Sequence, residues 1–133
     1  MIDRYVALAE FLAARATTPF VWGENDCCVF AADAVRAQTG RDPMSTWRGS
    51  YGDELGAETL LLAAGGVARM ATEELDIPLP RVTTAQRGDV VLFESGNGPA
   101  LGVCVGANFA AVRPAGGLGY FSMRHAVTAW RIE

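Results

Sequence analysis

The feature that most constrains the fold is a change in the spacing of apolar residues near Gln86. Before this point, apolar residues recur every three to four positions, as between Ile2 and Ala13, which indicates amphipathic helices. After it, short apolar runs alternate with glycines, which indicates strands joined by tight turns. Helices followed by a strand meander predict an α+β fold, with the N-terminal helices packed on one face of an antiparallel β-sheet.

Local signals place the ends of these elements. Asp3, Asp26 and Asp53 each precede an apolar-periodic run and are good N-caps, and Gly40 is a natural C-cap for the second helix. A glycine pair at 65–66 separates the third helix from a short fourth one. We expect strands at 90–93, 101–106, 109–113, 120–123 and 127–132.

Composition restricts the function classes. The 133 residues are 50% hydrophobic, which suits a single domain spanning 1–133 with a proper core. The net charge is -4 and the 11 basic residues are scattered arginines, which argues against nucleic-acid and membrane partners. Three cysteines without a CxxC pair indicate neither a disulfide framework nor a metal site, and we expect no cofactor. The N-terminus lacks the pattern of a signal peptide, so we expect a cytoplasmic or virion-associated protein.

The stretch from Phe20 to Phe30 carries the most chemistry. Asn25 and Asp26 are followed by Cys27 at the expected first turn of a helix, where the helix dipole and free amides favour a thiolate. Cys27 is therefore a candidate nucleophile. The alternative is that Cys27 and Cys28 are small apolar residues of the core, because free cysteine is often buried.

Other polar and aromatic residues allow two interpretations each. Asp33 lies near the apolar stripe of the same helix, as a functional acid or as a hydrogen-bonded edge residue. The loop with Trp47 and Tyr51 either covers a cleft or pins itself to the core.

Several of these stretches together resemble the NlpC-type cell-wall hydrolases, the bacterial branch of the papain-like cysteine peptidases. The matching parts are Val21-Trp22-Gly23, Asp26-Cys27, the helix ending at Gly40, and the strands 88–93 and 102–106, within residues 18–114. The resemblance implies a papain-like fold with Cys27 as nucleophile on a central helix. It also implies a general-base histidine at the start of the second strand. Members of the family cut peptide or amide bonds in peptidoglycan, and some are carried on phage tails.

The chain departs from the family pattern at the base. Ala100 stands at the position of the catalytic histidine, and the third polar position falls near Ala111. The only histidine, His125, lies in a connection that the pattern does not use for catalysis. We expect Cys27 to face Ala100 across a shallow cleft that includes Trp22 and Asp26 and is floored by Gly102. Cys28 should point elsewhere and be buried.

Two functions follow from this departure. The first is a degenerate papain-like domain that acts as a binding or assembly component of a phage or prophage tail, with other tail proteins or cell-wall peptides as partners. The second is an active cysteine hydrolase, a peptidoglycan endopeptidase or amidase, in which Cys27 attacks and His125 or another group is the base. A third kind of chemistry, transient acylation of the thiol, needs no acid for the leaving group. The group that faces the Cys27 sulfur discriminates between these functions.

Overall fold

The computed structural model describes residues 3–133 of the chain. Its four α-helices are α1 (Arg4–Arg15), α2 (Cys27–Thr39), α3 (Glu54–Ala63) and α4 (Val67–Leu75). Its strands are β1 (Val90–Glu94), β2 (Pro99–Cys104), β3 (Asn108–Val112), β4 (Leu118–Ser122) and β5 (Ala126–Trp130). Two short 3₁₀ helices, η1 (Val82–Thr84) and η2 (Met123–His125), precede β1 and β5.

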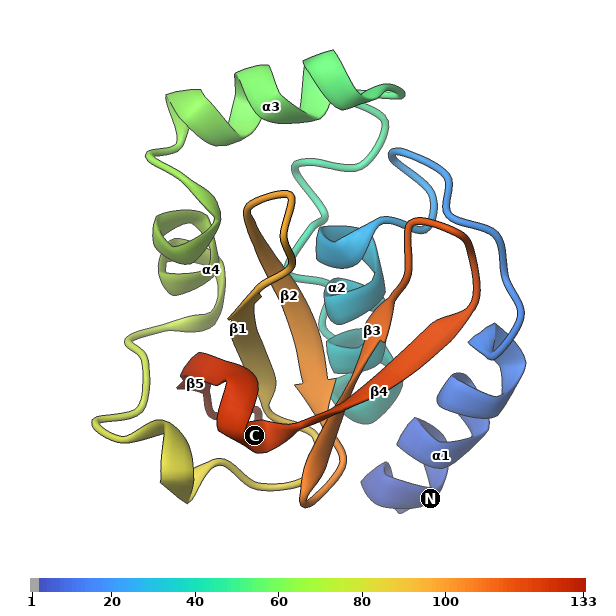
Figure 1. The fold of residues 1–133 in the computed structure, drawn as a ribbon, viewed down its shortest axis with the longest axis vertical. Helices are drawn as coiled ribbons and strands as arrows, with labels where there is room; N and C mark the ends of the chain where they lie inside the picture. Colours follow the sequence, from blue (N-terminus) through green and yellow to red (C-terminus); the bar gives the residue numbers. More distant parts are fainter. Residues whose placement is uncertain (1–2) are drawn as a thin grey trace.

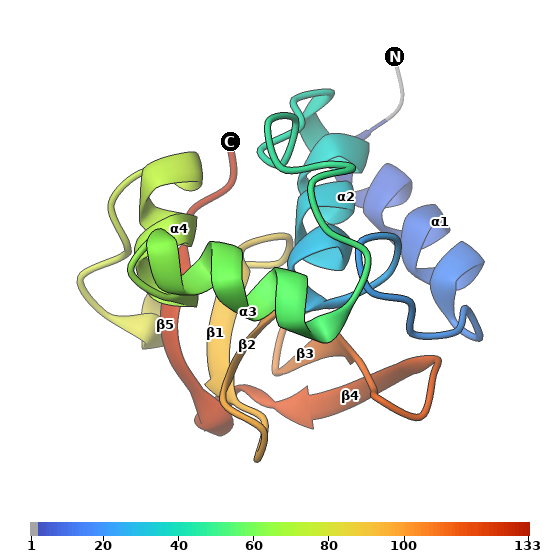
Figure 2. The same cartoon turned by 90° about the horizontal axis from the view of Figure 1, so that it is seen from above.

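The five strands form one antiparallel sheet in the order β4-β3-β2-β1-β5. Helix α2 packs across β2 and β3 on one face, and α1 packs beside α2. In Figure 1, α2 lies behind the sheet and the short helix η2 lies in front of it. Figure 2 shows α1, α2 and α4 on the same side of the strands. The predicted α+β architecture, with helices on one face of an antiparallel sheet, is confirmed.

Aspartates begin three of the helices, as their sequence positions predict. The carboxylate of Asp3 accepts hydrogen bonds from the amides of α1, and Asp26 and Asp53 do the same for α2 and α3. Helix α2 ends at Gly40, which has a φ of 79° in the left-handed region. β1 begins at Val90 as expected, and the other strand boundaries differ from the expected ones by one or two residues.

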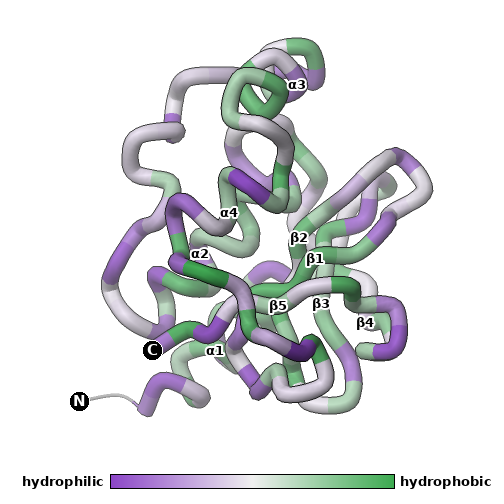
Figure 3. The backbone as a smooth tube through the Cα atoms, turned by 90° about the vertical axis from the view of Figure 1, so that its left-hand side faces the viewer, coloured by the Kyte–Doolittle hydropathy of each residue, from purple (hydrophilic) through white to green (hydrophobic). Residues whose placement is uncertain are grey.

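Both faces of the sheet are buried. On the helix face, Val90, Leu101 and Val103 pack under α1, α2 and α4. On the opposite face, Val91, Cys104 and Phe109 form a second core, covered by residues next to η1 and η2. Figure 3 shows hydrophobic stretches along the strands, with hydrophilic residues at the turn between β1 and β2. None of the helices within residues 3–133 has the length and apolar character needed to cross a membrane.

The left-handed cap of α2 gives a first prediction. A Cβ atom at position 40 has no steric neighbour within 4 Å, so the cost of Gly40→Ala comes from the positive φ alone. We expect this variant to lose about 1 kcal/mol of unfolding free energy in urea titrations. Gly52→Ala is the matched control, because position 52 is equally open and its φ lies outside the left-handed region. Equal stability of the two variants would contradict this explanation of the cap.

Candidate functional site

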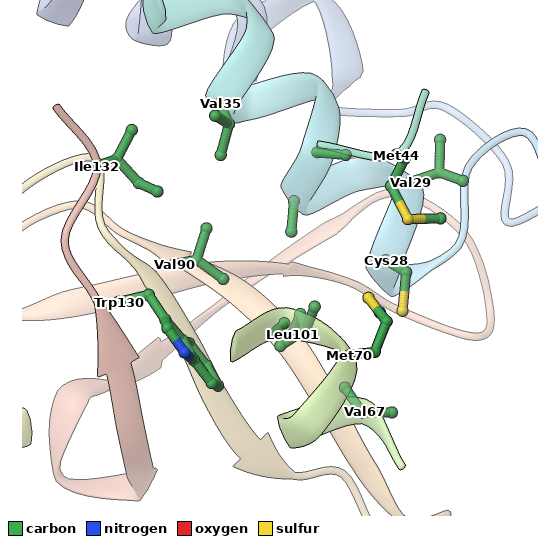
Figure 4. Packing of buried hydrophobic residues seen from close by; sticks show 13 residues of the cluster. Cys28, Val29, Val35, Met44, Val67, Met70, Val90, Leu101, Trp130 and Ile132 are labelled. Carbon is green, nitrogen blue, oxygen red and sulfur yellow. The ribbon is translucent and has the colours of Figure 1, made fainter. Parts of the chain in front are cut away.

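Cys27 is the first residue of α2, directly after the N-cap, as predicted. Its side chain is half-buried, whereas Cys28 is buried in the core. The two sulfur atoms lie 3.9 Å apart, within hydrogen-bond range of a thiol and a thiolate. Figure 4 shows Cys28 at the start of α2 beside Met44 and Met70, with Leu101 of β2 next to them. The prediction that Cys28 is buried is confirmed.

Asp26 fixes the start of α2 and the loops around it. Its carboxylate accepts hydrogen bonds from the amide of Val29 at 2.9 Å, the amide of Gly23 at 2.9 Å and the hydroxyl of Tyr51 at 2.5 Å. The carboxylate is buried, and its three donors satisfy both oxygens. Burial and the hydrogen bond to Asp26 raise the pKa of Tyr51 well above its usual range, so this hydroxyl stays protonated.

A cavity opens beside Cys27. It has about 330 Å³ of empty space, part of it open to solvent. Its walls are Trp22, Asp26, Cys27, Cys28, Met44, Trp47, Tyr51, Ala57, Leu61 and Met70. The loop before α3 and the helices α3 and α4 therefore supply most of the apolar wall, and the N-terminus of α2 supplies the thiol. The expected cleft residues Trp22 and Asp26 do lie in this cavity with Cys27.

The surroundings of Cys27 favour its thiolate. The thiol of Cys28 lowers the pKa of Cys27 as a hydrogen-bond donor, and the backbone amides of Leu101 and Cys28 lower it further. Burial and the negative charge of Asp26 oppose this effect, but the net result is a pKa below that of a free thiol. The hydrogen bond to Cys27 and burial raise the pKa of Cys28, so Cys28 is the thiol that keeps its proton.

The predicted geometry of β2 was wrong. A Cβ atom at Gly102 would lie 2.9 Å from the ring of Phe109, which belongs to the core on the face opposite α2. Since side chains alternate along a strand, Ala100 shares that face with Gly102 and points away from Cys27. Neither residue lines the cavity. The residue of β2 that lies against Cys27 is Leu101, which is buried in the helix-side core.

No residue at the other expected positions supplies a base. Ala111 is buried in the core on the face opposite α2. His125 is exposed in η2, whose first residue, Met123, contacts that same core. Because His125 is the only histidine of the chain and does not line the cavity, no imidazole lies among the cavity residues.

The structure decides the interpretations left open for Asp33 and for the loop with Trp47 and Tyr51. Asp33 forms ion pairs with Arg15 of α1 and with Arg48 of the loop before α3, so it links α2 to both of these segments. Trp47 and Tyr51 both cover the cavity and pin their loop. The contact between Tyr51 and Asp26 was missed because no local pattern links residues 25 positions apart.

The side chains at the cavity offer thiol chemistry. Among residues 3–133, no three histidine, cysteine or acidic side chains gather closely enough to hold a metal ion. The polar side-chain groups at the cavity are the two thiols, the Asp26–Tyr51 pair and the indole N–H groups of Trp22 and Trp47. The arrangement provides a nucleophile and donors that stabilise its anion, but the cavity lining includes no imidazole to protonate a leaving amine.

The thiolate interpretation predicts how alkylation depends on pH. Because only the thiolate reacts, the rate of Cys27 alkylation by iodoacetamide should reach half of its maximum at a lower pH than for a free thiol. Cys28→Ala removes the strongest donor and should shift this midpoint to higher pH. Cys28→Ser keeps a donor and should shift it less. The measurement is the rate of mass increase across pH 5 to 10. A midpoint unchanged by Cys28→Ala would show that the second thiol does not stabilise the anion.

One protein-family model matches almost the whole chain. A family model described as a domain of unknown function, DUF6950, matches residues 2–132. No curated protein matches the sequence.

Proposed function

Because the chain belongs to the DUF6950 family, a domain of unknown function, we propose its role from the site itself. The proposed role is that of a degenerate papain-like domain, which binds or assembles rather than hydrolyses. The position of Cys27 on a helix packed across an antiparallel sheet supports the papain-like assignment. So does the resemblance of this segment to the NlpC-type hydrolases.

One observation carries the loss of hydrolysis. No imidazole lines the cavity beside Cys27, the residue of β2 whose amide approaches the Cys27 sulfur is the apolar Leu101, and His125 is on η2 outside the cavity. General acid–base catalysis contributes about two to four orders of magnitude in rate. An amine leaves only after it gains a proton, so a thiolate without that acid forms an adduct that reverts to the amide. The expected outcome is a reactive thiol without peptide-bond turnover.

We place this role in the tail of a phage or prophage, where proteins of the resembling family occur. The partners would then be other tail proteins or cell-wall peptides, and the location would be the virion. The acidic net charge supports a partner other than nucleic acid.

The second candidate is an active cysteine hydrolase of peptidoglycan with Cys27 as nucleophile. The lowered pKa of Cys27 and the cavity beside it favour this function. This function requires a general base that is not among the cavity residues. His125 is the only histidine of the chain and therefore the only imidazole that could take this role.

Separate incubations with peptidoglycan fragments and with iodoacetamide distinguish the two candidates. We expect alkylation at Cys27 and no cleavage. Cys27→Ala should lose the label, and His125→Ala should keep it. Cleavage that disappears in both variants would overturn the proposal and make His125 the general base. Cleavage that disappears in Cys27→Ala alone would also establish a hydrolase, with a base other than His125.

A further inference from the structure

We propose that Cys27 accepts short apolar acyl groups from thioesters by thiol exchange and holds them in the cavity beside it. The proposal rests on the proposed function, since it takes the absence of an acid–base residue as its starting point. Acyl thioesters suit a thiolate nucleophile in a cavity without an acid–base residue.

The chemistry of the cavity wall selects an apolar ligand. Both oxygens of the Asp26 carboxylate already accept hydrogen bonds, from Gly23, Val29 and Tyr51. This carboxylate is therefore engaged within the protein and is not oriented toward a ligand. The hydroxyl of Tyr51 is used in the same pair. Apart from the indole N–H groups of Trp22 and Trp47, the second of which donates to Glu74, the remaining wall consists of aromatic rings, methionines and aliphatic side chains.

A polar or anionic acyl group would lose its water against a wall that is mostly apolar, and an anion would also meet the charge of Asp26. The empty space of about 330 Å³ includes open solvent, so the enclosed part is smaller and suits an acyl group of only a few carbons.

The reaction balances without an acid or a cofactor. The Cys27 thiolate attacks the carbonyl carbon of the thioester, and a new carbon–sulfur bond forms at Cys27. The bond to the original sulfur breaks, and that sulfur leaves as a thiolate. The leaving thiolate takes a proton from water, which replaces the proton that Cys27 released on ionisation. A thiol has a pKa of about 8.5, so unlike an amine it departs as an anion near neutral pH.

The same absence of a base should preserve the product. Hydrolysis of the acyl-Cys27 thioester needs an activated water molecule, and no imidazole lines the cavity. The acyl group should therefore remain on Cys27 until another thiol removes it by the reverse exchange. The domain would act as an acyl acceptor or carrier rather than a hydrolase.

The test uses the full chain and the butyryl thioester of N-acetylcysteamine. We expect an increase of one butyryl group by intact-mass measurement, located at Cys27 by peptide mapping. The increase should be lost in Cys27→Ala and retained in Cys104→Ser. The reaction should be faster than that of a free peptide with the sequence of residues 22–30, whereas the succinyl thioester should gain no such advantage. Ala57→Leu, which fills part of the cavity, should slow butyrylation by a larger factor than it slows alkylation by the smaller iodoacetamide.

The outcomes separate this inference from the proposed function. Alkylation of Cys27 without butyrylation would overturn the acyl-acceptor inference and leave the binding function standing. Equal rates with the butyryl and succinyl thioesters would overturn the role of the apolar cavity, even if Ala57→Leu failed to fold. Cleavage of peptidoglycan fragments would overturn the proposed function instead.

Discussion

Replacement of Leu101 by histidine is expected to convert a single acylation of Cys27 into turnover. With p-nitrophenyl butyrate, the natural chain should release one equivalent of nitrophenol and then stall. Leu101→His places an imidazole on the helix face of β2, in the hydrophobic cluster against which Cys27 packs and at the residue whose backbone amide approaches the Cys27 sulfur. A base in this position should raise the steady-state rate by about 10²-fold or more, since it activates water for deacylation.

Ala100→His is the matched control for this experiment. The side chain at position 100 points to the opposite face of the sheet, so this histidine should leave the steady-state rate unchanged. The gain of Leu101→His should vanish when Cys27→Ala is added. Thermal unfolding of each variant checks that a histidine at the buried position 101 leaves the fold intact. Activation by Ala100→His but not by Leu101→His would show that the face assignment of β2 is wrong.

The elements of the fold could be predicted because their signals are local. Asp26 and Gly40 mark the two ends of α2 by capping, which depends on neighbours within four residues. The glycine-rich turns likewise mark the strands. The position of Cys27 in the first helical turn, and of Trp22 near it, could be predicted for the same reason.

The direction of side chains on β2 could not be predicted from the same signals. A shift of one residue exchanges the two faces of a strand, and the alternation of apolar and polar residues normally reveals the buried face. In β2 both faces are buried, so Leu101 and Val103 differ little in polarity from Gly102 and Cys104. The family pattern then put Ala100 opposite Cys27, whereas the structure puts Leu101 there. The conclusion that no base faces Cys27 survives, because both residues are apolar.

Long-range polar contacts escaped prediction for a related reason. Tyr51 reaches Asp26 and Arg48 reaches Asp33 only because the loop before α3 folds back over α2. Nothing in the spacing of these residues specifies such a return. The aromatics of the loop left open whether it covers a cleft or pins itself to the core, and its hydrogen-bond partners follow from the tertiary structure.

Removal of the Asp26 carboxylate should destabilise the protein and at the same time make Cys27 more reactive. Asp26→Ala deletes the N-cap of α2 and leaves the amide of Gly23 and the hydroxyl of Tyr51 without their acceptor. We expect a loss of about 3 kcal/mol in urea unfolding, the sum of a lost cap and two unmade hydrogen bonds. The negative charge of Asp26 raises the pKa of Cys27, so its loss should lower that pKa. Alkylation at pH 7 should then be faster.

Asp26→Asn separates the charge from the hydrogen bonds. Its amide oxygen can still accept from Val29, so α2 keeps its cap, but the amide nitrogen cannot accept from Gly23. Asp26→Asn should therefore lose less stability than Asp26→Ala and show the same increase in alkylation rate, because both variants lack the charge. Urea unfolding and the iodoacetamide rate at pH 7 measure the two effects independently. An alkylation rate that rises in Asp26→Ala and stays unchanged in Asp26→Asn would assign the increase to loosening of the helix start instead of to the charge.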